Sequence, residues 1–394
     1  MEIQGLAGGG DGVARMPDGL TLFVPFTAPG DRVRVRVLER RRSFGRGEIA
    51  ELLEAGPGRS APGCPAFGRC GGCRWQHIDY AAQVKAKREI LGEALVRIGG
   101  WTLPDEFPFT PSPSAYGYRT RARLLVGQTG IGYRQAGSHA LCAVEGCPIL
   151  VPELDAELSR LAHSGELRAD PKSEAEWELV ADEEGRVRKH RVGPALRAFS
   201  GNSSERIEFR AGADSIAVSA GTFVQANRLL HGALHQAVLE SAGQGRRALE
   251  LHGGAGFFGL SLARQFETVE IVEASPGAVA DLRANLQRAG LGHVRVIEGD
   301  VEEVLKSRSV ARPDLVLLDP PRSGLSSAAT DEIIALAAAR IVYLSCDPAT
   351  LARDTARLRE GGYSLESIQG FDLFPQTPHV EALAVLVPTA GPQG

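Results

Sequence analysis

Hydrophobic and polar positions follow three different patterns along the chain, and the first is a short alternation. Between residues 1 and 55, apolar and polar positions alternate in runs such as 20–25 and 33–37, and glycine-rich turns separate the runs. A period of two is typical of strands with one buried face, and several short strands with tight turns favour a small β-barrel. The Gly- and Pro-rich stretch 56–63 then predicts a linker.

The second pattern, from residue 56 to 215, mixes a helix with strands. Asp79 is followed by apolar positions at helical spacing, which predicts a helix that this aspartate caps and a pair of glycines ends. Residues 118–126 alternate arginines with small or apolar residues, which predicts a strand with one basic face. The stretch 151–215 gives only a weak signal. We therefore expect a mixed α+β domain.

The third pattern, from residue 216 to 394, alternates apolar strands with helical segments. The strand candidates are 248–252, 269–273, 294–297, 315–318 and 341–344, and helical spacing follows each of them. This alternation is typical of a doubly wound, mostly parallel sheet with helices on both faces. The expected fold is therefore multidomain, with a β-barrel at 1–55, a mixed central domain at 56–215 and a Rossmann-like domain at 216–394.

Composition places the chain among ordinary globular proteins. Of its 394 residues, 43% are hydrophobic and 23% are charged, which excludes bulk disorder and leaves room for two or three domains. No apolar run approaches the roughly 18 residues that a membrane span needs, and the first residues lack the basic and apolar regions of a secretory signal. We therefore expect a cytoplasmic protein with no membrane partner.

Charge narrows the choice of partners. The net charge is −4, from 44 basic and 48 acidic side chains, so a strongly basic coat for nucleic acid is excluded. A local basic stripe is present nevertheless, because residues 32–46 hold seven arginines and a single acid, Glu39. This stripe is either a solvated strand face or a phosphate-binding surface on a small barrel, and both interpretations stay open.

A glycine turn at 253–256 follows the first strand of the α/β part. Glycines let the backbone approach a ligand at the carboxyl end of a strand. Glu273 ends the next strand, where an acid can accept the hydroxyls of a ribose. Phe257 and Phe258 crowd the place that a pyrophosphate would take, so the turn favours S-adenosylmethionine over NAD. A purely structural turn is the third possibility.

Two further strand ends carry reactive side chains. Asp319 is followed by two prolines, which form a rigid lip on which the acid could bond a planar polar ring. Cys346 ends the next strand between Ser345 and Asp347, where a thiolate could act as a nucleophile in a conjugate addition. The alternatives are a loop that only ends a strand and a buried structural thiol.

Six cysteines are few for this length, and three of them cluster. Cys64, Cys70 and Cys73 fall within ten residues, and Cys142 and Cys147 follow downstream. Without an export signal, a metal or catalytic role is favoured over disulfides. Zinc sites usually pair two CxxC motifs, and one is present here, whereas a 4Fe–4S cluster accepts a three-plus-one arrangement. Zinc and free thiols remain as alternatives.

Seen together, these motifs resemble the RNA (uracil-5-)-methyltransferase family, in its iron–sulfur branch that acts on 23S ribosomal RNA. Residues 1–55 resemble the family's TRAM barrel, an RNA-binding module. The other matching blocks are Cys64, Cys70, Cys73-x-x-Gln76-His77, Cys147-Pro148-Ile149, Phe223-x-Gln225-x-Asn227, Asp319-Pro320-Pro321-Arg322, Ser345-Cys346-Asp347-Pro348 and Phe374-Pro375-x-Thr377-x-His379-Val380-Glu381.

The resemblance implies a role for each matching residue. Cys346 is the expected nucleophile and Glu381 the expected general base. The residues expected to bind the cofactor are Gln225, His252, Glu273, Asp300 and Asp319. The expected ligands of a 4Fe–4S cluster are Cys64, Cys70, Cys73 and Cys147, which leaves Cys142 free. Two positions depart from the family pattern, because His252 replaces an aromatic residue and Asp347 stands where Asn is usual.

The implied function is S-adenosylmethionine-dependent methylation of C5 of a uridine in 23S rRNA, through a covalent bond between Cys346 and C6 of the base. We expect a monomer with RNA as its partner. A tRNA T-loop uracil-5 methyltransferase is the close alternative, and a non-catalytic RNA-binding iron–sulfur protein is the distant one. A small-molecule methyltransferase is disfavoured, because such a substrate needs no basic stripe.

Overall fold

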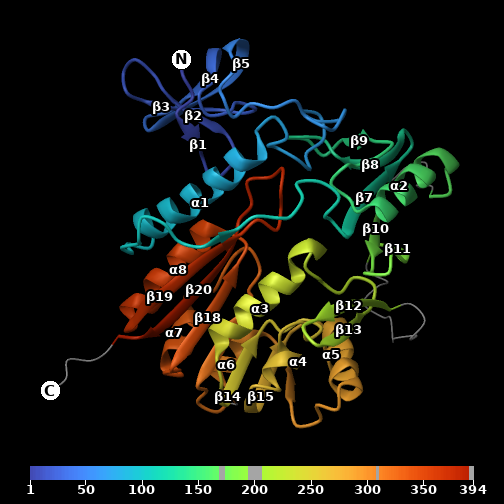
Figure 1. Cartoon of the computed structure of the whole chain (residues 1–394), viewed down its shortest axis with the longest axis vertical. Helices are drawn as coiled ribbons and strands as arrows, with labels where there is room; N and C mark the ends of the chain where they lie inside the picture. Colours follow the sequence, from blue (N-terminus) through green and yellow to red (C-terminus); the bar gives the residue numbers. More distant parts are fainter. Residues whose placement is uncertain (168–173, 194–205, 308–309, 390–394) are drawn as a thin grey trace.

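The computed structural model describes residues 1–167, 174–193, 206–307 and 310–389. Figure 1 shows three connected parts, with the N-terminal strands at one end, the eight-stranded sheet at the other and a central sheet beside them.

The first part is a barrel-like sheet. Its strands are β1 (Gly5–Leu6), β2 (Gly12–Arg15), β3 (Thr21–Val24), β4 (Arg32–Arg40) and β5 (Phe44–Glu54), in the order β1-β2-β3-β5-β4. A bridge between Glu2 and Arg32 joins the first edge to the last. Alternate side chains of β2 and β3 are buried. The small barrel predicted from the period of two is therefore confirmed.

The central part combines a five-stranded antiparallel sheet with one helix. The sheet runs β11-β10-β7-β8-β9, from β7 (Arg121–Gly127), β8 (Gly130–Arg134), β9 (Leu141–Ala143), β10 (Ala175–Ala181) and β11 (Val187–Arg191). Helix α2 (Pro152–Ser164) buries Leu154, Leu158 and Leu161 against it. A separate hairpin of β12 (Ile207–Ala211) and β13 (Asp214–Val218) leads into the last part.

Helix α1 (Tyr80–Arg97) lies between the parts. The Asp79 side chain accepts hydrogen bonds from the backbone N–H groups of Ala81 and Ala82, so the predicted cap is present. Leu91 and Leu95 belong to one core with residues of the eight-stranded sheet, and α1 packs on α8 (Pro348–Glu360). Figure 1 shows α1 between the barrel and α8. The domain limits at 55 and 215 stay predictions.

The third part is the doubly wound sheet that the sequence predicts. Its order is β16-β15-β14-β17-β18-β20-β19-β6, with β14 (Gly245–Leu251), β15 (Phe266–Glu273), β16 (Arg295–Glu298), β17 (Leu315–Leu318) and β18 (Arg340–Ser345) parallel. Strands β19 (Tyr363–Phe371) and β20 (Glu381–Pro388) are antiparallel to each other, and β6 (Phe109–Thr110) completes the edge.

Helices cover both faces of this sheet. One core joins buried side chains of α3 (His231–Ala242), α4 (Gly259–Leu262) and α5 (Pro276–Arg288) to the sheet. The other face packs against α1, α6 (Val301–Lys306), α7 (Ser327–Ala335) and α8. A short 3₁₀ helix (Arg228–Leu230) precedes α3.

This topology gathers the ends of the parallel strands at one edge. The strand order reverses direction beside β14, which has β15 on one side and β17 on the other. Ligands of such sheets bind outside the carboxyl ends of the strands at this point. Among the described residues, none of the helices is both long and apolar enough to cross a membrane.

Candidate active site

Cys346 and Glu381 meet because two neighbouring strands are antiparallel. Cys346 follows β18, and Glu381 is the first residue of β20. Ser345 pairs with Ala382, so the next position along each strand brings Cys346 opposite Glu381. The nucleophile and base candidates, 35 residues apart in the sequence, therefore lie side by side at the edge where the parallel strands end.

Burial holds these groups in their protonated forms. It raises the pKa of the Cys346 thiol to about 11; the negative charge of Glu381 acts in the same direction, and Arg322 opposes both. Glu381 is only 2% exposed, and its pKa lies well above the usual range because of burial and the charge of Asp319. Burial also raises the pKa of Asp319 to about 7. Arg322 is thus the positive group that stabilises charge on the thiol.

The predicted cofactor residues Glu273, His252 and Asp300 adjoin one another at the ends of β14, β15 and β16. Glu273 accepts hydrogen bonds from the backbone N–H of Gly254 at 2.9 Å and of Ser275 at 2.7 Å. Asp300 caps α6 through the N–H groups of its first turn. Burial lowers the pKa of His252, and the charges of Glu273 and Asp300 oppose that shift.

The glycine turn has the tight geometry that its sequence predicts. His252, Gly254 and Gly256 all have positive φ, at 63°, 55° and 95°. A Cβ on Gly256 would stand 2.5 Å from a methyl carbon of Leu260, so only glycine fits. His252 adopts this conformation without being glycine, which is uncommon and typical of functional turns.

Glu250 belongs to this site although its role was not predicted. It lies in β14, is 3% exposed, and its Oε2 has no hydrogen-bond partner. Burial raises its pKa far above the usual range, and Asp319 and Glu273 add to the shift. The Oε2 atom of Glu250 lies directly beneath the backbone of Gly253 and Gly259, where an added Cβ would stand 3.4 Å and 2.4 Å from it. The available signal was an acid within the apolar run 248–251.

Gln225 is buried, but the contacts of its segment point to the central sheet. Its carbonyl accepts from the ring of His231 at 2.7 Å, and the neighbouring Ala226 carbonyl accepts from the N–H of Thr120. The Asn227 side chain caps the 3₁₀ helix and bonds the Ser112 hydroxyl. The cofactor role of Gln225 therefore stays a prediction.

A groove of about 670 Å³ opens beside Cys346. The β1–β2 turn contributes Gly8 and Gly9, helix α1 contributes residues such as Ile90 and Arg97, and Pro378 and His379 close the side next to Glu381. The barrel, helix α1 and the eight-stranded sheet with its loops therefore border the space in front of the thiol.

The four predicted cluster cysteines surround one cavity. Cys64, Cys70, Cys73 and Cys147 line a space of about 270 Å³, and Cys142 is absent from its lining. Burial raises the pKa of Cys70 to about 11 and that of Cys73 to about 12. Within the described ranges, no three His, Cys, Asp or Glu side chains are grouped closely enough to hold a single metal ion.

A four-cysteine cavity of this kind fits a cluster better than one ion. In a 4Fe–4S cluster each thiolate binds a different iron, so the sulfur atoms surround the cluster instead of converging on a point. A zinc ion needs all its ligands at about 2.0–2.3 Å. The donor set of four cysteines around one cavity thus fits a cluster.

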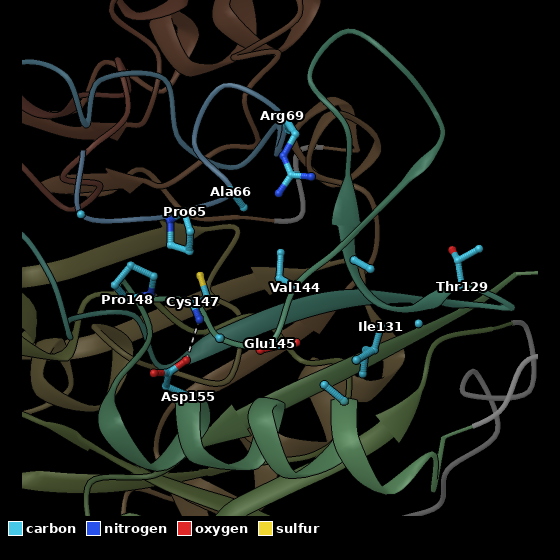
Figure 2. A pocket seen from close by; sticks show the side chains of 15 residues that line it. Pro65, Ala66, Arg69, Thr129, Ile131, Val144, Glu145, Cys147, Pro148 and Asp155 are labelled. Atoms are coloured by element: carbon cyan, nitrogen blue, oxygen red, sulfur yellow. Dashed lines mark hydrogen bonds between the residues drawn. The ribbon is translucent and has the colours of Figure 1, made fainter. Parts of the chain in front are cut away.

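A further cavity, of about 550 Å³, is lined by Cys147 together with Arg69 and Asp155 (Figure 2). The backbone N–H of Cys147 donates to Asp155 at 2.6 Å, and Figure 2 shows Arg69 reaching toward the cavity from the cysteine-bearing segment. The lining contains none of the predicted catalytic residues. This cavity is also smaller than the groove of about 670 Å³ beside Cys346.

The arginine stripe of the barrel is paired with acids from outside its own sequence window. Across β4 and β5, Arg32 bonds Glu54 at 3.0 Å, Arg34 bonds Glu51 and Arg36 bonds Glu48. Arg40 likewise pairs with Asp18 on a neighbouring loop. The structure thus favours a neutralised strand face, and phosphate binding by this stripe stays a prediction.

Comparison with known proteins agrees with this arrangement. A family model described as tRNA (uracil-5-)-methyltransferase matches residues 215–388, and a TRAM domain model matches residues 2–50. The 23S rRNA (uracil(1939)-C(5))-methyltransferase RlmD of Chromohalobacter salexigens is 35% identical, over 98% of this chain and 88% of its own. An uncharacterized RNA methyltransferase of Nostoc sp. is 34% identical over 98% of this chain and 95% of its own.

A solved structure is also similar over the whole length. The tRNA (uracil-54, C5)-methyltransferase of Pyrococcus abyssi, in complex with S-adenosyl-L-homocysteine, matches with a TM-score of 0.77. It is 26% identical in sequence, and the match covers 98% of this chain and all of that one.

Proposed function

Because the chain belongs to the RNA (uracil-5-)-methyltransferase family, we propose that it transfers a methyl group from S-adenosylmethionine to C5 of a uridine in 23S rRNA. The observation that carries the proposal is the proximity of Cys346 and Glu381, one position beyond the Ser345–Ala382 pair of β18 and β20. A nucleophile and a proton acceptor meet there, next to the strand ends where the cofactor residues gather.

Uracil C5 is a poor nucleophile, and the addition of Cys346 to the ring makes it more nucleophilic. The Cys346 sulfur adds to C6 and forms a C–S bond, which leaves the electron pair on the C5–C4–O4 enolate. Arg322 stabilises the thiolate that must form first. S-adenosylmethionine, when bound, would supply an electrophilic methyl group, and its transfer to C5 would leave S-adenosylhomocysteine. Glu381 then removes the proton from C5, the C6–sulfur bond breaks, and Cys346 is released.

The target base has to leave its stack to reach Cys346. The thiol lies at a groove bordered by the barrel, helix α1 and the eight-stranded sheet, so the nucleotides next to the target would contact more than one of these elements. RNA enzymes of this kind act on loops or flipped nucleotides. We therefore propose a single-stranded or extruded uridine as the substrate.

A tRNA T-loop uridine is the second candidate. The fold match to the Pyrococcus abyssi tRNA enzyme supports it, with 98% of this chain covered. The greater identity to RlmD proteins, 35% and 34%, supports the ribosomal substrate. A non-catalytic RNA-binding protein would not need the assembled pair of Cys346 and Glu381.

We propose further that Cys64, Cys70, Cys73 and Cys147 hold a 4Fe–4S cluster. The support is their shared cavity and the absence of Cys142 from its lining. The cluster takes no part in the transfer steps above. Its place between Cys147 of the central part and Arg322 and His379 of the sheet edge suits a structural role.

The test is a methyl-transfer assay on separate unmodified 23S rRNA and tRNA transcripts, followed by digestion and detection of 5-methyluridine. We expect label in the ribosomal transcript. Label only in tRNA would keep the chemistry and change the substrate. Absence of label in both, with iron present, would contradict the proposed reaction on these substrates.

Two substitutions test the assigned roles. Cys346→Ala should abolish methylation, because no covalent bond to C6 can form. Glu381→Gln should leave methylated RNA bound to the protein after denaturation, because the C5 proton is not removed. Cys142→Ala is the control and should methylate normally. A normal rate with Cys346→Ala would overturn the mechanism.

A further inference from the structure

The loop between β19 and β20, residues 372–380, borders both functional cavities. Pro378 and His379 line the groove beside Cys346, whereas Phe374, Thr377 and His379 line the four-cysteine cavity. The loop ends at Glu381, the proposed base. Its position therefore sets one wall of the methyl-transfer site.

This loop is held by the N-terminal half of the chain. The Gln376 carbonyl accepts from the N–H groups of Arg74 and Trp75, both at 3.0 Å. The Tyr118 hydroxyl donates to the Pro375 carbonyl at 2.9 Å. Arg74 directly follows Cys73, so the cysteine-bearing segment and the loop share these bonds.

Gln83 of α1 forms two hydrogen bonds with Gln376, in the middle of the loop. Its Nε2 donates to the Gln376 side-chain oxygen at 3.0 Å, and its Oε1 accepts from the Gln376 backbone N–H at 2.9 Å. Gln376 has a φ of 69°, a strained conformation for a residue other than glycine. Such strain persists only where surrounding bonds fix the backbone, and it clusters at functional sites.

Lys87, one turn further along α1, binds the first residues of the loop. Its ammonium donates to Asp372 at 2.5 Å and to the Phe374 carbonyl at 2.9 Å. Both side chains of the pair are 0% exposed. A fully buried ion pair is a costly way to gain stability, and its best-attested use is to fix one arrangement of the chain.

We infer that Gln83 and Lys87 are positioning residues, which hold the β19–β20 loop so that Glu381 and His379 face Cys346. The inference rests on the proposed function, since it assigns these residues to the same reaction. Neither side chain lines the groove beside Cys346. They act through Asp372 and Gln376, from which the chain continues to the base.

The expected consequence falls on the second half of the reaction. Addition of Cys346 to C6 needs the thiol and the base of the RNA, and β18 places the thiol. Removal of the C5 proton needs Glu381 at the right distance, and this is the step that the loop controls. Loosening the loop should therefore slow release of the RNA more than its capture.

The test variant is Lys87→Met combined with Asp372→Asn, because removing both charges avoids a lone buried ion. Lys85→Met is the matched control, since it makes the same change at an exposed site on the same helix. Gln83→Leu is the second, independent variant. Melting curves and RNA affinity establish that each protein is folded and binds.

We expect the double variant and Gln83→Leu to turn over at least about tenfold more slowly than the control, with RNA affinity within about threefold. The fraction of enzyme covalently bound to methylated RNA after denaturation should rise several-fold. Turnover and adduct equal to those of Lys85→Met would overturn the inference. The inference would also be overturned if activity fell only in proportion to the loss of folded protein and the covalent adduct did not increase.

A second measurement needs no RNA and separates this inference from the proposed function. The rate of Cys346 alkylation by iodoacetamide is followed against pH by peptide mass spectrometry. A released loop should shift this profile relative to Lys85→Met, because Pro378 and His379 border the thiol. If wild type fails to methylate any RNA, a shifted profile still supports the positioning role, and an unchanged one contradicts it.

Discussion

At the residue scale, burial raises the pKa values of the acids at the reactive centre. Cys346, Asp319, Glu250 and Glu381 all have raised pKa values, with burial as the first cause of each. One guanidinium, that of Arg322, opposes the shift at both Cys346 and Glu381. Raised pKa values of this kind reduce the mutual repulsion between neighbouring carboxylates, because fewer of them are charged at the same time.

This protonation pattern predicts an alkaline pH profile. Cys346 attacks as a thiolate and Glu381 acts as a carboxylate, so both must lose protons. With a thiol pKa of about 11, the thiolate fraction rises about tenfold per pH unit below that value. The single-turnover rate of methylation should therefore increase from pH 6.5 to pH 9.

The matched variant for this prediction is Arg322→Gln. Loss of the guanidinium should raise the pKa of Cys346 further, so the rate should fall by a similar factor at every pH from 6.5 to 9, because this range lies below the thiol pKa of both proteins. A single-turnover profile that is flat or falls with pH in the wild-type protein would refute the assigned protonation states.

At the element scale, the pairing of β4 with β5 places acidic side chains beside the arginines of β4. The arginines of β4 alternate along one face, and glutamates of β5 stand opposite three of them. Exposed pairs contribute little to stability, but they remove net positive charge from the surface. These acids belong to the following strand, so the sequence of β4 alone does not show that its arginines are paired.

The pairing predicts that an acid limits RNA binding by the barrel. Glu51→Gln should free Arg34, strengthen RNA binding about two- to fivefold at low salt, and steepen the salt dependence, because one more cation becomes available to phosphate. Glu360→Gln, an exposed acid at the end of α8, makes the same charge change far from the barrel.

Filter binding at several salt concentrations measures this effect. Equal salt slopes for Glu51→Gln and Glu360→Gln would show that this face of the barrel does not contact RNA phosphates.

At the scale of the whole molecule, the barrel, helix α1 and the cysteine cavity all adjoin the loop that leads to Glu381. The barrel reaches the Cys346 groove through Gly8 and Gly9, and α1 forms a wall of it. The cysteine cavity lies on the other side of the β19–β20 loop, where His379 lines both spaces. A substitution in the cysteine-bearing segment should therefore also change the reactivity of Cys346.

Iron binding tests this arrangement. Cys73→Ser should lose iron and its visible absorbance, lower the melting temperature and reduce methylation, because a cavity built for four thiolates loses one ligand. Cys142→Ser should keep its iron, since Cys142 does not line the cavity. Equal iron loss in both variants, or full iron content in Cys73→Ser, would contradict the proposed ligand set.

Much of this protein is determined by local sequence. The alternation in β2 and β3, the glycine turn after β14 and the cap at Asp79 each depend on residues a few positions apart, because backbone sterics and short-range hydrogen bonds act locally. The positions of Asp319 and Cys346 after apolar strands also follow, since parallel strands share a ligand edge. The role of Glu381 came from family resemblance.

Tertiary structure alone decided how distant segments combine. It set the register that places Glu381 against Cys346, and the burial that keeps Glu250 protonated. It also joined Lys87 to Asp372, 285 residues away. Contacts of this kind depend on the packing of whole elements, so no local pattern in the sequence encodes them, and the positioning of the reactive groups is a property of the assembled fold.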